Sequence, residues 1–349
     1  MKTKFKNICR KIAIFFYKGR YFWVKLGFML LTIFLTTIMI FFILRLTPGD
    51  TVVNYAKSIM SARPGISYEQ AYREAVNLLN YDPEAPILQQ FGRFFVGLFN
   101  GTLGMSIYRQ DITAVLLIKQ KLPWTLFIAT IALVISFLLG TWLGSVMARK
   151  RRTKADAALS GVVLFVNSIP DYLIGLLLIM LFAYDLKIFP TSGNYDIYYT
   201  PGFNLAFIIN VLWHATLPIL ALILSSVGSW ALQMRSNAIG VLGEDYIYCA
   251  KARGLSERLI TRRYLKRNAL LPLVTSLALS FAVLFGGSTL IEGIFNYPGL
   301  GQELASRIGL RDYFVVQGIL FFSSTIVILV NFLTDMIYYL IDPRVRRGT

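Results

Sequence analysis

The sequence of 349 residues has few of the side chains on which soluble enzymes rely. It contains two cysteines and one histidine, and only 15% of its residues are charged. A soluble domain of this length would carry about a quarter charged residues. The scarcity of charge therefore excludes an ordinary soluble globular protein.

The missing side chains also exclude several kinds of site. His214 has no partner for a Cys/His metal site, and Cys9 and Cys249 fall in segments that we place in the cytoplasm, so we expect no metal and no disulfide. No stretch matches the GxxxxGK[ST] phosphate-binding loop, so we expect the chain to bind no nucleotide itself. Asp171 and Asp335 are isolated acids in apolar segments, so they provide no paired carboxylates and we expect no catalytic residues.

Hydrophobic residues make up 56% of the sequence and are concentrated in long runs. Runs of about 20 apolar residues can cross a bilayer as helices. Pro123 is expected to open the second span, and Gly140 and Gly144 form a GxxxG pattern found where helices pack closely. The sequence predicts an all-α integral membrane protein with six transmembrane helices, at about residues 26–45, 123–148, 157–183, 213–234, 271–291 and 315–341.

The distribution of Lys and Arg predicts the orientation. Residues 1–25 hold eight basic residues and no acid, and the short stretch 149–154 reads "RKRRTK". Short loops rich in Lys and Arg remain in the cytoplasm, which places both termini there. The net charge of +17 then reflects topology and attraction to anionic lipid, not nucleic-acid binding. The predicted divisions are a cytoplasmic basic N-terminal segment 1–25, a long extracytoplasmic segment 46–121, a core 122–341 with a cytoplasmic loop 235–270, and a cytoplasmic basic tail 342–349.

Two stretches outside the spans have patterns of their own. One indicates a segment at the membrane interface and the other a short helix that docks on a partner. Within the long external segment, residues 89–99 are rich in aromatic side chains, which predicts a segment at the membrane interface. In the loop 235–270, Glu244 and Asp245 suit a helix start and Gly254 suits a left-handed helix end. A helix of about nine residues is too short to be stable alone, so we expect it to dock on a partner. The face expected to dock carries Tyr246, Cys249, Ala250 and Arg253.

The stretch from Cys249 to Pro272, "CAKARGLSERLITRRYLKRNALLP", resembles the cytoplasmic EAA loop of binding-protein-dependent ABC importer permeases. It is most similar to the oligopeptide, dipeptide and nickel subfamily, and to its B-type subunits. Where the general family pattern has Glu-Ala-Ala, this chain has Tyr248, Cys249 and Ala250, so an ATPase contact cannot rest on a glutamate at position 248. Other motifs occur in the family's order: "LRLTPGD" (44–50), "LPWTL" (122–126), "HATLP" (214–218), "NYPGLG" (296–301), "RDYFVVQG" (311–318) and "DPRVRR" (342–347).

The resemblance implies the type I ABC importer permease fold in a bacterial cytoplasmic membrane. It implies a second homologous permease, two cytoplasmic ATPases that each hold a coupling helix, and an extracytoplasmic binding protein. ATP and magnesium would be bound by the ATPases and no cofactor by this chain. The expected cargo is peptide, with nickel or another small solute as the alternative. The residues expected at the ATPase contact are Asp245, Tyr246, Cys249, Ala250, Lys251, Ala252, Arg253, Gly254 and Leu255.

Two intramembrane acids need partners, since a carboxylate in the middle of a span costs at least about 2.5 kcal/mol. For Asp171, one hypothesis is that it lines the translocation pathway and meets a cationic group such as a peptide amine. The alternative is a structural contact beside a kink at Pro170, where freed backbone groups need partners. For Asp335, we expect packing against the partner permease or a cytoplasmic basic residue.

Overall fold

The computed structural model describes residues 2–46, 51–79, 85–108 and 111–341. The chain forms two compact units, one made of residues 1–116 and 307–349 and the other of residues 117–306. The end of the "LRLTPGD" motif (47–50) and the tail 342–349 with its "DPRVRR" motif lie outside the described residues.

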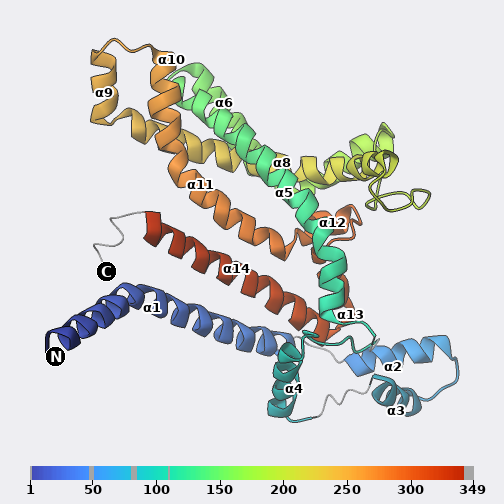
Figure 1. The fold of residues 1–349 in the computed structure, drawn as a ribbon. Coiled ribbons are helices and arrows are strands. Elements are labelled where there is room, and N and C mark those ends of the chain that lie inside the picture. Colours follow the sequence, from blue (N-terminus) through green and yellow to red (C-terminus); the bar gives the residue numbers. More distant parts are fainter. Residues whose placement is uncertain (1, 47–50, 80–84, 109–110, 342–349) are drawn as a thin grey trace. The chain divides into compact units, whose positions relative to one another are not determined.

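In the first unit, two long helices from opposite ends of the chain lie side by side (Figure 1). The Lys25 ammonium of the N-terminal helix lies 2.7 Å from the Asp335 carboxylate of the C-terminal helix, which confirms the expectation of a basic partner for Asp335. The pair gives both charges a partner within apolar helices. The helices of this unit are α1 (Lys2–Leu46), α2 (Thr51–Ala62), α3 (Tyr68–Leu79), α4 (Ile87–Phe99) and α14 (Tyr313–Ile341).

The segment between α1 and the next long helix, α5 (Ala114–Arg149), is fixed to the start of α14 by one buried carboxylate. Asp312 is fully buried, and it accepts hydrogen bonds from the Ser106 hydroxyl at 2.6 Å and from the Ile107 backbone N–H at 3.0 Å. The Arg307 guanidinium lies 3.1 Å from the same carboxylate. Asp312 therefore has a structural role within the "RDYFVVQG" motif, because it ties two stretches far apart in the sequence.

The second unit contains the remaining elements, except for the first residues of α5 and the last residues of α13. It is almost entirely helical over the residues that the structure describes. The elements are α5 (Ala114–Arg149), α6 (Lys154–Asn167), α7 (Asp171–Leu178), the π-helical η1 (Ile179–Asp185), α8 (Leu205–Leu242), α9 (Asp245–Ala252), α10 (Glu257–Leu259), the π-helical η2 (Ile260–Leu265), α11 (Lys266–Val283), the 3₁₀ turn η3 (Leu284–Gly286), α12 (Thr289–Ile294) and α13 (Leu300–Leu310).

Among the described residues, five helices are long and apolar enough to cross a membrane, and a bent helix pair raises the number to six. The bent pair consists of α6 and α7 with η1, which meet at 88°. The third predicted span, over 157–183, is therefore bent sharply at Pro170, where the sequence suggested a kink. Proline has no backbone N–H and disfavours helical backbone in the residue before it, so Pro170 ends α6 and begins α7 in a new direction.

The second span starts differently from its prediction. Pro123 was expected at the start of the helix, but it lies inside α5. The helix begins at Ala114, where the Thr113 hydroxyl accepts a hydrogen bond from the Leu116 N–H at 3.2 Å. This side-chain cap satisfies a backbone donor that the first turn leaves unpaired. The helix start is thus set by a cap in the polar stretch upstream and not by the proline.

The GxxxG pattern in α5 marks a close helix contact, as predicted. A methyl group added at Gly140 would lie 2.7 Å from the Val227 carbonyl oxygen of α8, and one added at Gly144 would lie 2.8 Å from the Met234 Cβ. Real carbon atoms do not approach so closely. Both glycines are therefore needed for α5 and α8 to pack at this distance.

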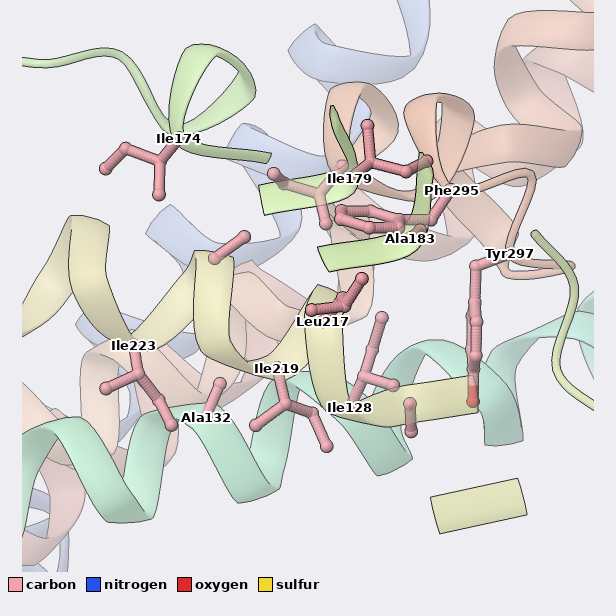
Figure 2. Packing of buried hydrophobic residues seen from close by; sticks show 13 residues of the cluster. Ile128, Ala132, Ile174, Ile179, Ala183, Leu217, Ile219, Ile223, Phe295 and Tyr297 are labelled. Atoms are coloured by element: carbon pink, nitrogen blue, oxygen red, sulfur yellow. The ribbon is translucent and has the colours of Figure 1, made fainter. Parts of the chain in front are cut away.

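A buried hydrophobic cluster fills the space where α5, α7, η1 and α8 meet (Figure 2). Ile128 of α5, Leu217 of α8 and Phe295 after α12 are nearly inaccessible to solvent. Many other large apolar side chains of these helices are exposed, among them Trp142 of α5 and Leu177 of α7. Such exposure over a helix surface is typical of contact with lipid.

The loop between η1 and α8 is held by polar contacts to α8. The His214 ring nitrogen Nδ1 lies 3.1 Å from the Ser192 carbonyl oxygen, and Nε2 lies 3.4 Å from an Asp196 carboxylate oxygen. The Asn210 amide donates to Asp196 at 2.7 Å. These contacts hold the loop against the N-terminal part of α8.

We predict that Gly144→Ala destabilises the protein by about 1–3 kcal/mol, because the added methyl group forces α5 and α8 apart. Gly240→Ala is the matched control, since nothing lies within 4 Å of its added methyl group. In a helix that change should be neutral or stabilising by up to about 1 kcal/mol. Thermal unfolding in detergent, followed by the fraction that remains monodisperse, measures both. Equal melting temperatures for the two variants would contradict the close contact.

Candidate functional site

The loop between α8 and α11 contains the short helix that the sequence predicts. Helix α9 spans Asp245–Ala252 and lies beyond the C-terminal end of α8 (Figure 1). Gly254 follows with φ of +72°, the left-handed conformation expected for it at the helix end. Asp245 lies in the first turn, where a negative charge interacts favourably with the helix dipole.

The face of α9 that packs inward differs from the prediction. Ile247 and Ala250 are buried together with Ile260 of η2, at 1%, 3% and 2% exposure. In this chain Ala250 therefore packs inside the loop and does not share an exposed face with Tyr246, Cys249 and Arg253, whereas the ATPase contact of α9 stays a prediction. Ile247 is the one large aliphatic residue of α9, so it turns its own side of the helix, Ala250 included, toward the loop interior.

The outward face of α9 consists of residues at the i, i+3, i+4 and i+7 positions. Cys249 lies on both the predicted face and the observed one. Tyr248 was not among the expected contact residues, although its position three residues after Asp245 and one turn before Ala252 places it on the same helix face as both. The exposed residues of this face are Asp245, Tyr248, Cys249 and Ala252.

The other expected contact residues have contacts within the loop or lie at its edge. Tyr246 is partly exposed, and its hydroxyl accepts a hydrogen bond from the Asn268 amide at 3.2 Å. The Lys251 ammonium lies 3.7 Å from Glu257, and Leu255 packs against the buried cluster of the loop. Arg253 and Gly254 are exposed at the end of α9.

An ion pair fastens the end of α8 from which the loop departs. The Arg235 guanidinium donates to both carboxylate oxygens of Asp156 in α6, at 2.9 and 2.8 Å. Asp156 is buried, and two parallel hydrogen bonds fix the geometry of such a pair. The sequence alone does not indicate this ion pair, because Arg235 and Asp156 are 79 positions apart.

A cavity of about 490 Å³ lies among α5, α8 and α11. Its wall combines apolar residues with hydroxyl groups and one amide, and no charged side chain lines it among the residues that the structure describes. The sequence analysis did not identify the polar residues of this wall. Serines spaced one turn apart within apolar spans indicate a shared polar face and could have been used. The polar residues of the wall are Ser225, Ser226, Ser229, Gln233, Ser276, Ser280 and Ser288.

The serines of α8 and α11 donate most of their hydroxyl protons within the protein. Ser225 and Ser226 donate to the Leu222 carbonyl oxygen, at 3.0 and 2.5 Å, and Ser276 donates to the Pro272 carbonyl oxygen at 3.4 Å. A hydroxyl group that donates one hydrogen bond keeps lone pairs to accept others. The cavity wall can therefore accept hydrogen bonds from a polar molecule without presenting a charge.

Asp171 lies at the first position of α7, directly after Pro170. Its carboxylate accepts a hydrogen bond from the neighbouring Tyr172 N–H at 2.8 Å. It is half-buried and is not among the residues that line the cavity. The kink at Pro170 is present, and Asp171 makes its hydrogen bond directly beside it, while the pathway role of Asp171 stays a hypothesis.

A second buried carboxylate shapes one end of the cavity wall. Glu292 of α12 is fully buried, and it accepts hydrogen bonds from the Thr125 hydroxyl at 2.8 Å and the Gln302 N–H at 3.0 Å. It also accepts one from the N–H of Ser288, a residue of the cavity wall, at 3.4 Å. Gly299 lies so close that an added methyl group would be 2.6 Å from the Thr125 hydroxyl oxygen. Glu292 thus joins α5, α12 and α13 beside the cavity.

Burial raises the pKa of Glu292 above the ordinary carboxyl value, although the backbone and hydroxyl donors act in the opposite direction. Removal from water disfavours the charged form of an acid. The folded protein therefore holds this proton more tightly than the unfolded chain does.

The profile of one protein family, described as "Binding-protein-dependent transport system inner membrane component", matches residues 140–347. The chain belongs to this family. The match begins at Gly140 of α5 and includes both the loop with α9 and the serines of the cavity wall. This inner membrane component is therefore a multi-pass membrane protein, as the spans indicate.

Individual relatives match over almost their whole length. The di/tripeptide transport system permease protein DppB of Pseudomonas aeruginosa is 33% identical over 92% of this chain and 97% of its own. The oligopeptide transport system permease protein AppB of Bacillus subtilis is 30% identical over 88% and 93% of the two chains. The dipeptide transport system permease protein DppB of Lactococcus lactis is 28% identical over 94% and 99%.

A solved structure supports the fold of this permease component. A chain of the MetNI methionine ABC transporter, in an inward-facing conformation, superposes with a TM-score of 0.51 at 19% identity. The superposition covers 65% of this chain and 96% of the other. The type I ABC importer permease fold expected from the sequence is thus confirmed.

We predict that the stability of the wild-type transporter falls more steeply with rising pH than that of the Glu292→Gln variant. Because the folded-state pKa of Glu292 is raised, its contribution is fully present below the unfolded-state pKa and is lost as pH rises through the raised value. Glutamine does not titrate. Melting temperatures of both proteins across the range from acidic to neutral pH measure the difference, and parallel curves would contradict the raised pKa.

Proposed function

We propose that this permease imports peptides as one of two homologous permease subunits of an ATP-driven ABC importer. The observation that carries the proposal is the near full-length match to relatives named for dipeptide, di/tripeptide and oligopeptide transport. An extracytoplasmic binding protein delivers the peptide, and two cytoplasmic ATPases bind and hydrolyse ATP with magnesium. This chain itself binds no cofactor.

The proposed orientation follows from the basic residues. Both termini and the loop 235–270 lie in the cytoplasm, and the segment 46–121 lies outside. The orientation brings α9 to the side where ATP is available. It also brings residues 149–154 and the start of α6 to that side, so that the Arg235–Asp156 pair lies near the cytoplasmic surface.

The outward face of α9 is the proposed docking surface for an ATPase. Cys249 and Ala252 have small side chains, which allow a groove of the partner to approach the helix backbone. The rest of the loop holds this face in place through Ile247 and Ala250. Shape therefore matters more than charge at this contact, although Asp245 and Arg253 at the two ends of α9 can add ion pairs.

The cavity among α5, α8 and α11 is the proposed part of the peptide pathway on this subunit. A peptide backbone donates and accepts hydrogen bonds along its whole length, and hydroxyl groups can match it at many positions. Nickel or another small solute is the alternative cargo. Transition metals prefer imidazole or thiolate ligands, so the hydroxyl groups and the amide of Gln233 favour peptide.

We predict that Ala252→Trp lowers ATP-driven peptide uptake by about tenfold or more, because the bulky ring prevents close docking of α9. The fold should persist, since Ala252 is exposed. Uptake and ATP hydrolysis are measured in proteoliposomes that contain the complete transporter. Ala62→Trp is the matched control, an exposed alanine at the end of α2. Wild-type uptake by Ala252→Trp would show that this face does not dock an ATPase.

We also predict that Ser280→Trp reduces peptide uptake to background, while Ser280→Ala retains most of it. The indole ring fills a large part of a cavity of about 490 Å³, whereas alanine removes only one of several hydroxyl groups. The same proteoliposome assay measures both variants, and the assembled complex is checked by size-exclusion chromatography. Normal uptake by a correctly assembled Ser280→Trp transporter would place the pathway elsewhere.

A further inference from the structure

Helix α4 is attached to α1 by aromatic side chains. Phe41 of α1 is fully buried, and its ring centre lies 5.1 Å from that of Phe91 and 6.1 Å from that of Phe94. Gln90 of α4 is also buried, and its amide donates to the Ala85 carbonyl oxygen at 2.7 Å. One face of α4 is therefore fully occupied by contacts within the unit of residues 1–116 and 307–349.

A second face of α4 is apolar and exposed. Leu88 is 84% exposed, Val96 is 56% exposed and Phe99 is 76% exposed. Leu88 and Phe99 are eleven positions apart, so they lie on one side of the helix, with Phe95 between them. The rings of Phe91, Phe95 and Phe99 form a row, with neighbouring centres 6.0 and 5.1 Å apart. The aromatic row therefore runs from the buried contact with Phe41 to the exposed ring of Phe99.

The polar residues of α4 form a narrow margin. Gln89 and Arg93 lie one turn apart and are both exposed. They separate the exposed apolar face from the buried face on one side of the helix. An amphipathic helix with a basic residue at its polar margin is suited to lie in the interface of a bilayer, where the long arginine side chain reaches the headgroups.

The contact with Phe41 determines the depth of α4 relative to a membrane span. Phe41 lies five residues before Leu46, the last residue of the span Tyr21–Leu46, which corresponds to about 7.5 Å along a helix. Interfacial helices insert about 5–10 Å into the boundary between headgroups and acyl chains. Figure 1 shows α4 running across the direction of α1 at this end. Phe42, Ile43 and Leu46 near the end of α1 are also exposed, so the apolar surface of α1 continues toward α4.

We propose that α4 is an interfacial helix whose face of Leu88, Phe95, Val96 and Phe99 is covered by lipid acyl chains. The assignment to the outer leaflet rests on the orientation given with the proposed function, whereas the lipid contact itself rests on the structure. The partner is the lipid surface and not another protein chain. Contact with lipid at α4 and with Phe41 on its other side gives the segment between α1 and α5 a fixed position at the membrane surface.

Fluorescence quenching in the complete transporter, reconstituted in nanodiscs, tests the proposal. The environment-sensitive amino acid Anap is introduced singly at Leu88, Val96 and Phe99 by amber suppression. Arg93 on the polar margin and Ser61 in α2, both exposed, are the matched control positions. Lipids brominated on the acyl chains report contact with the hydrocarbon, and iodide reports contact with water. We expect brominated lipid to quench the three apolar positions several-fold more strongly than the controls, and iodide to show the reverse order.

Two results would overturn the proposal. Strong iodide quenching at all three apolar positions would show that water covers the face. Protection from both quenchers would show that a protein chain, such as the second permease, covers it. The three positions share one face, so the result does not depend on the assembly of a single variant. Quenching does not require transport, so failure here is distinguishable from failure of the proposed function, which uptake measures.

Discussion

The second unit depends on the close approach of α5 and α8 at Gly140 and Gly144. Between helices in lipid the hydrophobic effect contributes little, so helix association relies on close van der Waals contact, which small residues permit. The contact brings α8 next to α5 along the stretch where Trp230 packs its ring edge-to-face on Phe137. The cavity is bounded by the same two helices, so its width follows from the glycines.

Helix α8 also connects the two candidate sites. Its middle part contributes Ser225, Ser226 and Ser229 to the cavity wall, and its C-terminal end leads into the loop that holds α9. The bidentate Arg235–Asp156 pair lies between these two regions and fastens α8 to α6. A displacement of α9 by the proposed ATPase would thus act on a helix that lines the cavity. Because a packed helix moves as a body, this connection offers a direct mechanical route for coupling.

The chemistry of the cavity suits transport more than tight binding. A charged group in the wall would bind the opposite charge of a peptide terminus strongly and slow its release. Hydroxyl groups whose protons are already donated within the protein accept hydrogen bonds that are individually weak. A peptide can therefore enter the cavity favourably and still leave it. The family description implies a separate substrate-binding protein, which can contribute the tighter binding.

The sequence alone determined the membrane class, the approximate spans, the short helix with its glycine end and the family, because hydropathy, capping residues and motif order are local properties. It also marked the close contact at Gly140 and Gly144. It did not determine the buried position of Ala250 or the partners of Asp156, Asp312 and Glu292. Those depend on residues up to 206 positions apart, as between Ser106 and Asp312. Only tertiary packing decides which face of a short helix is already occupied, and so which face remains for a partner.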